Sequence, residues 1–509
     1  MREREVKLAA PPTFRMADLA DLADLADGLV AVPGEPLRFQ TVYFDTADLR
    51  LVRWGCSLRH RSGEGWTAKL PAELDGPVLV RGEHLFGGEP DRPPEEALDL
   101  LRAYVRGAPL APVARLRTVR RPVALLAGDG ERLGEIVDDE VSVIDRGRLA
   151  ARFREVEVEA AAGMSGELLD AVVERLRAVG AGAPDPTPKY VRALGPRALA
   201  PAEVVAGGAG DRGAPATVGD ALRAALARSV VRLIRHDPGV ALGEDPEDVH
   251  QARVATRRLR SDLRTFRSIL EPEWTAALRE ELRWLGARLG AVRDSEVLLE
   301  RLRARSAGLP STDRVAADAL FAELAGARDA AREALLAARR DQRFDRLLDR
   351  LVEAAVAPPL APEAGRPAAG SLGEVLARPL AHLRRAVRDL GEEPPDDELH
   401  RVRILAKRCR YAAEDAAPAL GGRAARLAAA AAGLQDVLGE HHDAVVAEAW
   451  LRERADRACT EEAEPAAAAR LAFVTGELAG LELEAARAAR AAWPAAWHEL
   501  SRRKVSGWL

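Results

Sequence analysis

The chain has 509 residues, of which 48% are hydrophobic, 30% are charged and three are cysteine, and its net charge is −5. This composition is typical of a globular protein of two to four domains of about 100–200 residues each; it excludes a disulfide framework and a uniformly basic nucleic-acid coat. No run approaches the roughly 18 apolar residues of a membrane span, and the charged N-terminus lacks the apolar core of a signal peptide, so we expect a cytoplasmic protein with no membrane partner.

The first part of the chain, residues 1–195, has the pattern of a β-rich domain. Short segments of alternating polar and apolar residues are separated by Gly, Pro and Asp, as in strands joined by turns. The expected strands cover 3–8, 37–44, 57–61, 66–70, 78–86, 113–126, 135–144 and 153–159, and helices are expected near 16–29, 94–106 and 165–179. About eight strands in one domain predict a closed antiparallel barrel.

Charged residues share one face of several expected strands, because successive side chains of a strand point to opposite faces. The sets that share a face are Glu3, Glu5 and Lys7; Arg59 and Arg61; Thr67 and Lys69; and Glu155, Glu157 and Glu159. Such faces on several strands indicate that the charges converge inside the barrel. Carboxylates hold hard cations such as Mg²⁺ or Mn²⁺, and Lys and Arg neutralise phosphates, so the pattern predicts a metal–polyphosphate ligand.

This part of the chain resembles the CYTH superfamily, the triphosphate tunnel fold shared by class IV adenylate cyclases and thiamine triphosphatases. The motifs that carry the resemblance are EREVK (3–7, an ExExK signature), YFDT (43–46), SLRHR (57–61), WTAKL (66–70), REVEVE (154–159) and TPKYVRAL (187–194). They occur in order and cover about 1–195.

The resemblance implies a role for most of the charged residues. The implied metal ligands are Glu3, Glu5, Asp139, Glu157 and Glu159, with Glu155 as a further acid. Asp138 and Asp139 face opposite ways in a strand, and the family pattern favours Asp139. The implied triphosphate-binding residues are Lys7, Arg59, Arg61, Lys69 and Lys189, to which we add Arg117 and Arg121, although the register of 115–121 is open. Glu3, Glu5 and Lys7 are the expected catalytic residues.

Two segments rich in Pro, Gly and Ala, 196–216 and 357–371, have the composition of linkers. The region from 217 to 509 is rich in Ala, Leu and Arg, with apolar residues at helical spacing. Within it, 250–260 and 400–410 share the pattern H-x-x-R-x-x-x-[RK]-R-x-R at an offset of 150, and 289–294 matches 438–443. We therefore expect a duplicated helical bundle with halves at about 217–356 and 372–509.

The repeated motif places cationic side chains on one stripe of a helix. His250, Arg253, Arg257, Arg260, Arg264 and Arg267 follow a 3-4-3-4-3 spacing, and His400, Arg403, Lys407 and Arg410 repeat its beginning. Only one acidic residue, Asp262, lies within 250–267. A stripe more than about 20 Å long suits a linear polyanion, while the lack of interleaved aromatic residues disfavours single-stranded nucleic acid.

This region resembles the CHAD domain, the conserved-histidine α-helical domain, over about 217–509. The resemblance is carried by DPEDVHQARVATRRLR (245–260), LGAVRD (289–294), LHRVRILAKRCRYAAE (399–414) and LGEHHD (438–443). It implies binding of inorganic polyphosphate, with granule association as a further implication. The implied residues are His250, Arg253, Arg257, Arg258, Arg260, Arg264, His400, Arg403, Lys407, Arg408 and Arg410. The second copy has Lys407 in place of Arg and His442 in place of Arg293, so the halves need not bind equally.

The predicted fold is thus α+β and multidomain, an antiparallel barrel followed by an all-α duplicated bundle. The predicted function is polyphosphate binding together with metal-dependent hydrolysis of inorganic triphosphate or polyphosphate in the barrel. Three alternatives stay open: a non-catalytic polyphosphate-binding or granule-targeting module, a cyclase acting on ATP, and nucleic-acid binding by the helical half. Oligomeric state, chain-length preference and metal identity are not given by the sequence.

Overall fold

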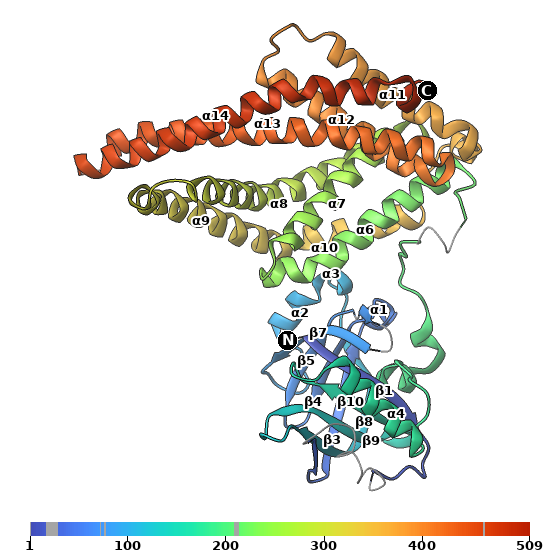
Figure 1. The fold of residues 1–509 in the computed structure, drawn as a ribbon. Helices are drawn as coiled ribbons and strands as arrows, with labels where there is room; N and C mark the ends of the chain where they lie inside the picture. Colours follow the sequence, from blue (N-terminus) through green and yellow to red (C-terminus); the bar gives the residue numbers. More distant parts are fainter. Residues whose placement is uncertain (1, 17–28, 72, 76–77, 208–212, 462–463) are drawn as a thin grey trace. The chain divides into compact units, whose positions relative to one another are not determined.

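The structure is a computed structural model that describes residues 2–16, 29–71, 73–75, 78–207, 213–461 and 464–509. These residues form two compact units, Met1–Glu203 and Val204–Leu509 (Figure 1). The helix expected near 16–29 falls almost wholly outside the described residues.

The first unit is built on a sheet of ten antiparallel strands, eight of which close into a ring. The ring order is β1, β10, β9, β8, β3, β4, β5 and β7, and β7 pairs with β1 to complete it. Its strands are β1 (Arg2–Ala10), β3 (Leu37–Asp45), β4 (Ser57–Arg61), β5 (Gly65–Lys69), β7 (Val78–Phe86), β8 (Ala111–Leu126), β9 (Arg132–Asp145) and β10 (Arg148–Ala160). Two short strands lie off the ring, β2 (Val30–Pro33) against β8 and β6 (Glu73–Asp75) against β7. The predicted closed antiparallel barrel is confirmed.

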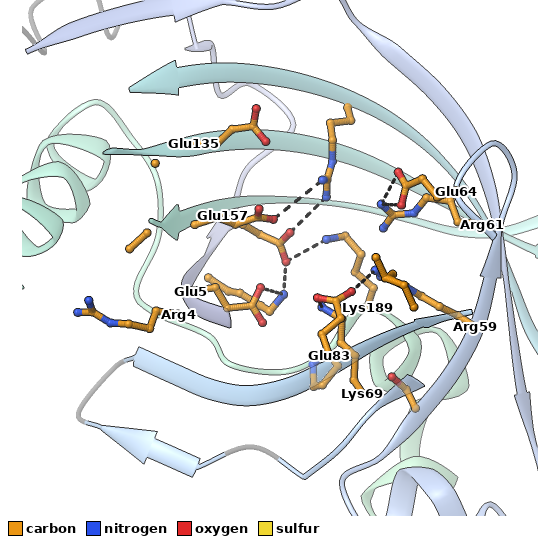
Figure 2. Close-up of a pocket in the computed structure, with 18 of the residues that line it drawn as sticks. Arg4, Glu5, Arg59, Arg61, Glu64, Lys69, Glu83, Glu135, Glu157 and Lys189 are labelled. Carbon is orange, nitrogen blue, oxygen red and sulfur yellow. Dashed lines mark hydrogen bonds and ion pairs between the residues drawn. The ribbon is translucent and has the colours of Figure 1, made fainter. Parts of the chain in front are cut away.

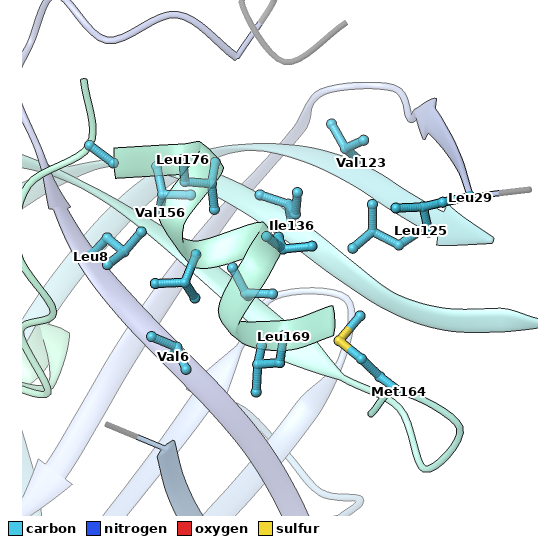
Figure 3. Close-up of a cluster of buried hydrophobic side chains, with 14 of the residues drawn as sticks. Val6, Leu8, Leu29, Val123, Leu125, Ile136, Val156, Met164, Leu169 and Leu176 are labelled. Carbon is cyan, nitrogen blue, oxygen red and sulfur yellow. The ribbon is translucent and has the colours of Figure 1, made fainter. Parts of the chain in front are cut away.

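Alternation along each strand separates a polar interior from an apolar exterior. The outward side chains of Val6, Leu8 and Val156 are buried beneath α4 (Gly166–Ala178), which contributes Leu169 and Leu176 to the same core (Figure 3). The helix begins at Ser165, whose side chain accepts a hydrogen bond from the Leu168 amide. Because α4 covers the outer face of β1 and β10, the side chains that alternate with these outward residues point into the lumen.

The other helices of this unit are short. They are α1 (Arg50–Arg53), α2 (Glu95–Leu100), α3 (Arg102–Val105), α5 (Lys189–Leu194) and the 3₁₀ helix η3 (Gly195–Leu199). The expected helix near 94–106 is therefore divided into α2 and α3. Part of the segment expected as a linker, 196–203, packs on the barrel unit, where the Glu203 carboxylate accepts a hydrogen bond from the Trp54 indole at 2.8 Å.

The second unit is all helical. Its first half holds α6 (Val218–Leu242), α7 (Pro246–Thr265), η4 (Arg267–Ile269), α8 (Pro272–Ser306), α9 (Ser311–Arg340) and α10 (Gln342–Val356). After η5 (Pro362–Gly365), the second half holds α11 (Ala368–Arg388), α12 (Asp396–Leu420), α13 (Gly422–Glu461), α14 (Pro465–Ser501) and α15 (Arg503–Ser506). The barrel followed by a duplicated helical region is the predicted fold class.

The two helical halves meet through equivalent elements. Each of α6, α7, α8 and α9 contacts its counterpart, α11, α12, α13 or α14, and α6 contacts α12 just as α11 contacts α7. Such reciprocal contacts are those of two copies related by an approximate twofold axis. They bring the two copies of the repeated basic motif, on α7 and α12, side by side.

Among the described residues, no helix combines the length and the apolar character that a membrane crossing would need.

Candidate functional site

A cavity of about 740 Å³ occupies the barrel interior and is lined by residues from all eight strands of the ring (Figure 2). The pairing register explains its charge, because residues that face each other across an antiparallel pair lie on the same side of the sheet. Glu5 pairs with Glu159 and Lys7 with Glu157 on one wall, and Lys69 pairs with Glu83 on another. The sequence-predicted convergence of charges in the lumen is what this register produces.

Three carboxylates meet on the wall formed by β1 and β10. One oxygen from each of Glu5, Glu157 and Glu159 lies within 4.8 Å of the others. Carboxylate oxygens at this spacing fit a hard divalent cation. The backbone of Glu3 pairs with Arg81 of β7, but the Glu3 side chain lies outside the described residues.

Asp139 lies outside this group but shares its cations, since Arg120 and Lys189 also contact Glu157. Its carboxylate accepts hydrogen bonds from the Arg120 guanidinium at 2.9 and 2.7 Å and lies 3.0 Å from the Lys189 amine. Asp138 points to the barrel exterior, where Arg154 binds it at 2.7 and 2.6 Å. The structure thus places Asp139, and not Asp138, on the inward face.

Two buried lysines hold the carboxylates of the lumen together. The Lys7 amine contacts Glu157 and lies 3.1 Å from Glu5. The Lys189 amine, which α5 carries into the barrel, lies 2.7 Å from Glu155 and 3.0 Å from Glu157. Burial alone would lower the pKa of each lysine, but the surrounding carboxylates outweigh burial and raise both pKa values.

The same network sets the charge of the acids. Burial would raise the pKa of Glu157, but Lys189 and Lys7 outweigh it and hold the pKa well below its usual range. For Glu155, burial is the largest effect and raises the pKa, although the positive charge of Lys189 acts in the opposite direction. At neutral pH, Glu157 is therefore ionised, and the lumen offers a charged carboxylate beside two ammonium groups.

Another wall carries the expected phosphate-binding residues of β4 and β5. Arg59 and Lys69 both reach Glu83, at 3.4 and 3.2 Å, and Arg61 donates to Glu64 at 2.9 Å. The two acids were not identified from the sequence. The position of Glu83 could have been found from the alternation of β7, whereas Glu64 lies in a turn, where alternation gives no signal.

On β8, the structure places Arg120 in the cavity and leaves the expected Arg117 and Arg121 outside it. Arg117 is exposed, and Arg121 lies 3.5 Å from Asp138 and 3.6 Å from Glu140 on the outer face. The cause is strand parity, because Arg120 pairs with the inward-facing Asp139. Arg120 thus replaces both residues as the lumen arginine of this strand.

In the helical unit, the basic residues of α7 and α12 form one continuous group. Burial lowers the pKa values of Arg403 and Lys407 on α12. The nearby positive charges of Arg253 and Arg257 on α7 lower these pKa values further. The pKa of Lys407 falls to about 7. We call these four residues the first basic cluster.

A second basic cluster extends the surface to the neighbouring helix α8. It consists of Arg260, Arg264, Arg279, Arg283 and Arg408. Burial lowers the pKa of Arg408 to about 10, with smaller contributions from the positive charges of Arg264, Arg279 and Arg260. No carboxylate of the described residues forms an ion pair with Arg260, Arg264 or Arg408. Arg279 and Arg283 were missed by the sequence because α8 carries them outside the repeated motif.

Several of the expected residues of this surface also have acidic partners. Arg258 and Arg410 share the carboxylate of Glu414. Arg253 lies 2.7 Å from Asp294, and Arg403 lies 3.8 Å from Asp443.

The two motif histidines lie at the same end of the stripe. The His400 ring packs against the His442 ring at a tilt of 37°, with centroids 4.1 Å apart. Burial and nearby arginines lower the pKa of His250, and burial, Arg403 and Lys407 do the same for His400, so both imidazoles are neutral at pH 7.

Comparison with known proteins assigns the helical half to a family. Residues 224–452 match the CHAD domain family. Relatives from two strains of Mycobacterium tuberculosis, both described as uncharacterised, are 31% identical over 456 residues, covering 83% of this chain and 83% of the relative.

Three solved structures are similar to parts of the chain. PptA from Streptomyces chartreusis is 27% identical, with a TM-score of 0.46, and the match covers 56% of this chain and 99% of PptA. The CHAD domain of the plant Ricinus communis is 30% identical, with a TM-score of 0.41, over 55% of this chain and 94% of that domain. A Hippeastrum adenylyl cyclase candidate, described as having a dominant triphosphatase activity, is 15% identical, with a TM-score of 0.26, over 38% of this chain and 98% of its own.

The family match includes the helices that carry both basic clusters. The similarity to the two mycobacterial relatives extends well beyond residues 224–452, since it covers 83% of this chain. The ExExK strand, the inward acids of β10 and the closed ring occur together in the first unit. The chain therefore belongs to the CHAD-domain proteins, and its first unit is a closed antiparallel barrel whose motifs resemble those of the CYTH superfamily.

Proposed function

We propose that the barrel hydrolyses phosphoanhydride bonds of inorganic triphosphate or polyphosphate with a divalent metal, and that the helical unit binds polyphosphate. The observation that carries the proposal is the composition of the lumen. Three adjacent carboxylates face Lys7, Lys189, Arg120 and the β4–β5 basic wall inside one closed barrel. A site that only bound phosphate would not need the carboxylates, which repel the ligand.

The donor set fits Mg²⁺ or Mn²⁺ because it consists of carboxylate oxygens alone. Glu5, Glu157 and Glu159 would hold the ion, with Glu3 and Asp139 as further candidates. When bound, a divalent cation would neutralise phosphate charge and lower the pKa of a water molecule.

The basic residues of the lumen have the complementary task. Arg59, Arg61, Lys69 and Arg120 would bind phosphate oxygens and oppose the negative charge that develops during phosphoryl transfer. Lys7 and Lys189 stay protonated because of their carboxylate neighbours, so they act as fixed positive charges and not as bases.

The two basic clusters of the helical unit support its role. Cationic side chains that repel one another in the absence of a ligand are stabilised when a polyanion binds between them. The group extends over α7, α8 and α12, which suits a chain of phosphates better than a single anion.

The test measures phosphate release from tripolyphosphate, long-chain polyphosphate and ATP, with Mg²⁺ or Mn²⁺ and with a chelator. We expect metal-dependent release from tripolyphosphate, and at least a 100-fold loss in Glu5→Gln. Glu140→Gln is the matched control, since Glu140 belongs to the outer face of the barrel and contacts Arg121. Retained polyphosphate binding without release from any substrate would favour the non-catalytic module, and formation of cyclic AMP with pyrophosphate would favour the cyclase.

A further inference from the structure

The barrel interior changes from exposed to buried along its axis. On β10, the exposed fraction of the inward side chain falls from 33% at Glu159 to 3% at Glu157 and 0% at Glu155. At the same end as Glu159 lie Glu135, its neighbour on β9, and Leu85, which is 71% exposed and lines the cavity. Solvent therefore reaches the lumen from the Glu159 end.

Beyond Glu155, the inward positions become apolar and buried. Strand parity directs Leu116 of β8, Val141 and Val143 of β9 and Tyr43 of β3 into the barrel. These side chains form one buried core with Tyr190 and Ala198. The rings of Tyr43 and Tyr190 stack with centroids 5.0 Å apart. Because close-packed side chains fill this core, the part of the barrel that the structure describes leaves no passage for a hydrated anion through this end.

The helix that supplies Tyr190 is fixed to the barrel at several points. The Tyr190 hydroxyl donates to the Cys56 carbonyl oxygen at 3.0 Å, and Lys189, one residue earlier, is bound by three carboxylates. The segment that follows is held by Arg53, which donates to the Pro201 carbonyl oxygen at 2.7 Å, and by the contact of Glu203 with Trp54. Both α5, which carries Tyr190 into the closed end of the barrel, and the segment that follows it are thus bound to the barrel.

We propose that the lumen is blind, so that only the free end of a linear phosphate chain enters and bonds are broken from chain ends and not within the chain. This proposal rests on the proposed hydrolase function and specifies its substrate as a terminus. In each step one water is consumed. Its oxygen bonds to phosphorus, the bridging P–O bond breaks, and the electron pair of that bond stays on the shortened or released phosphate while the protons of the water pass to the products.

The test uses polyphosphate of one length with no, one or both termini capped by a bulky amine through a phosphoramidate bond. We expect the uncapped and singly capped chains to be shortened from the free end, with the doubly capped chain cleaved at least 100-fold more slowly. Gel analysis should show the whole chain population shortening gradually while a short product accumulates, whereas cleavage within the chain would give a broad spread of lengths early in the reaction. Cleavage of the doubly capped chain within tenfold of the uncapped rate would overturn the blind lumen.

A different result would contradict the proposed hydrolase function itself. In that case the protein would release phosphate neither from tripolyphosphate nor from any of the capped or uncapped polyphosphates. In that case the blind lumen is tested by binding, with full-length Arg253/Arg257/Arg260→Ala protein so that the helical surface contributes little. Singly capped tripolyphosphate should bind and doubly capped tripolyphosphate should not. Equal binding of the two ligands would overturn the proposal even without turnover.

Discussion

Lys407 is a basic residue of the helical surface whose pKa lies near neutral. It lies in the first basic cluster, where burial and the neighbouring Arg257, Arg403 and Arg253 lower its pKa to about 7. At pH 7 it is about half protonated, and its neutral form avoids repulsion from the arginines. A bound polyanion favours the charged form, so ligand binding raises the pKa and takes up a proton when the pH is above 7.

The affinity for polyphosphate should therefore fall as the pH rises from 6 to 9, by about tenfold for one lost charge. Lys407→Arg is the matched variant, because a guanidinium stays charged throughout this range. Binding is measured at constant ionic strength, and proton uptake by calorimetry in buffers of different ionisation enthalpy. An equally steep pH dependence in Lys407→Arg would rule out Lys407 as its source.

In the lumen of the barrel, Glu157 forms ion pairs with both Lys7 and Lys189. Its folded-state pKa is held below the unfolded value, so its contribution to stability is present above about pH 4.5 and is lost as the pH falls through the folded-state pKa. Glu157→Gln leaves two buried ammonium groups with fewer partners, and it should cost about 3 kcal/mol of unfolding free energy at pH 7. Urea denaturation at pH 7 and pH 4 checks both points: the cost should shrink at the lower pH, and a constant cost would contradict the assigned charge.

At the scale of the element, α7 and α12 bring arginines close enough to repel one another, which destabilises the fold in the absence of a ligand. Among the described residues, no carboxylate forms an ion pair with Arg408, which lies among Arg260, Arg264 and Arg279, whereas Arg258 is neutralised by Glu414. Position on the helix therefore decides which arginines remain available to a phosphate chain.

We expect Arg408→Gln to weaken polyphosphate binding by about tenfold and to lower the salt dependence of binding by about one charge. Without ligand the same variant should be more stable than the parent by about 1 kcal/mol, a figure reduced for water screening at this partly exposed site. Arg258→Gln should do neither, since it leaves Glu414 to Arg410. Thermal melts with and without polyphosphate, and binding at several salt concentrations, distinguish the two; equal effects of both variants would contradict the distinction.

The elements also show what the sequence reveals and what it leaves open. Alternation was sufficient for the strands and for the inward faces of β1 and β10, because two or three charged residues of one parity stand out there. On β8, the arginines at 115, 117, 120 and 121 occupy both parities, and only the pairing of Arg120 with Asp139 decides which one enters the lumen. Arg279 and Arg283 belong to the basic surface through the packing of α8, which no pattern within α8 reveals.

The segment at 196–203 is a further limit. Its Pro, Ala and Gly content is that of a linker, yet Arg53 and Trp54 bind its backbone and its Glu203 side chain. These contacts are made by residues about 150 positions earlier in the chain, so local composition could not reveal them.

At the scale of the whole molecule, the two units should be separable in function. Glu5→Gln should abolish phosphate release and leave long-chain polyphosphate binding within about twofold of the parent. Arg253/Arg257/Arg260→Ala should weaken binding by about 100-fold or more, from the loss of three charges, and retain release from tripolyphosphate at saturating substrate. Both quantities are measured on the same preparations. If either variant damaged both activities equally, the division of labour would be wrong.

The second basic cluster has a consequence for the direction of a chain on the helical surface. Four of its five arginines, Arg260, Arg264, Arg279 and Arg283, belong to the first helical half and Arg408 belongs to the second, so the surface is not symmetric. Nucleic acids have chemically distinct 5′ and 3′ directions, so such a surface would meet a different sequence of groups in each orientation. Linear polyphosphate is identical from both ends, so under the proposed function either end of a chain meets this cluster equally well.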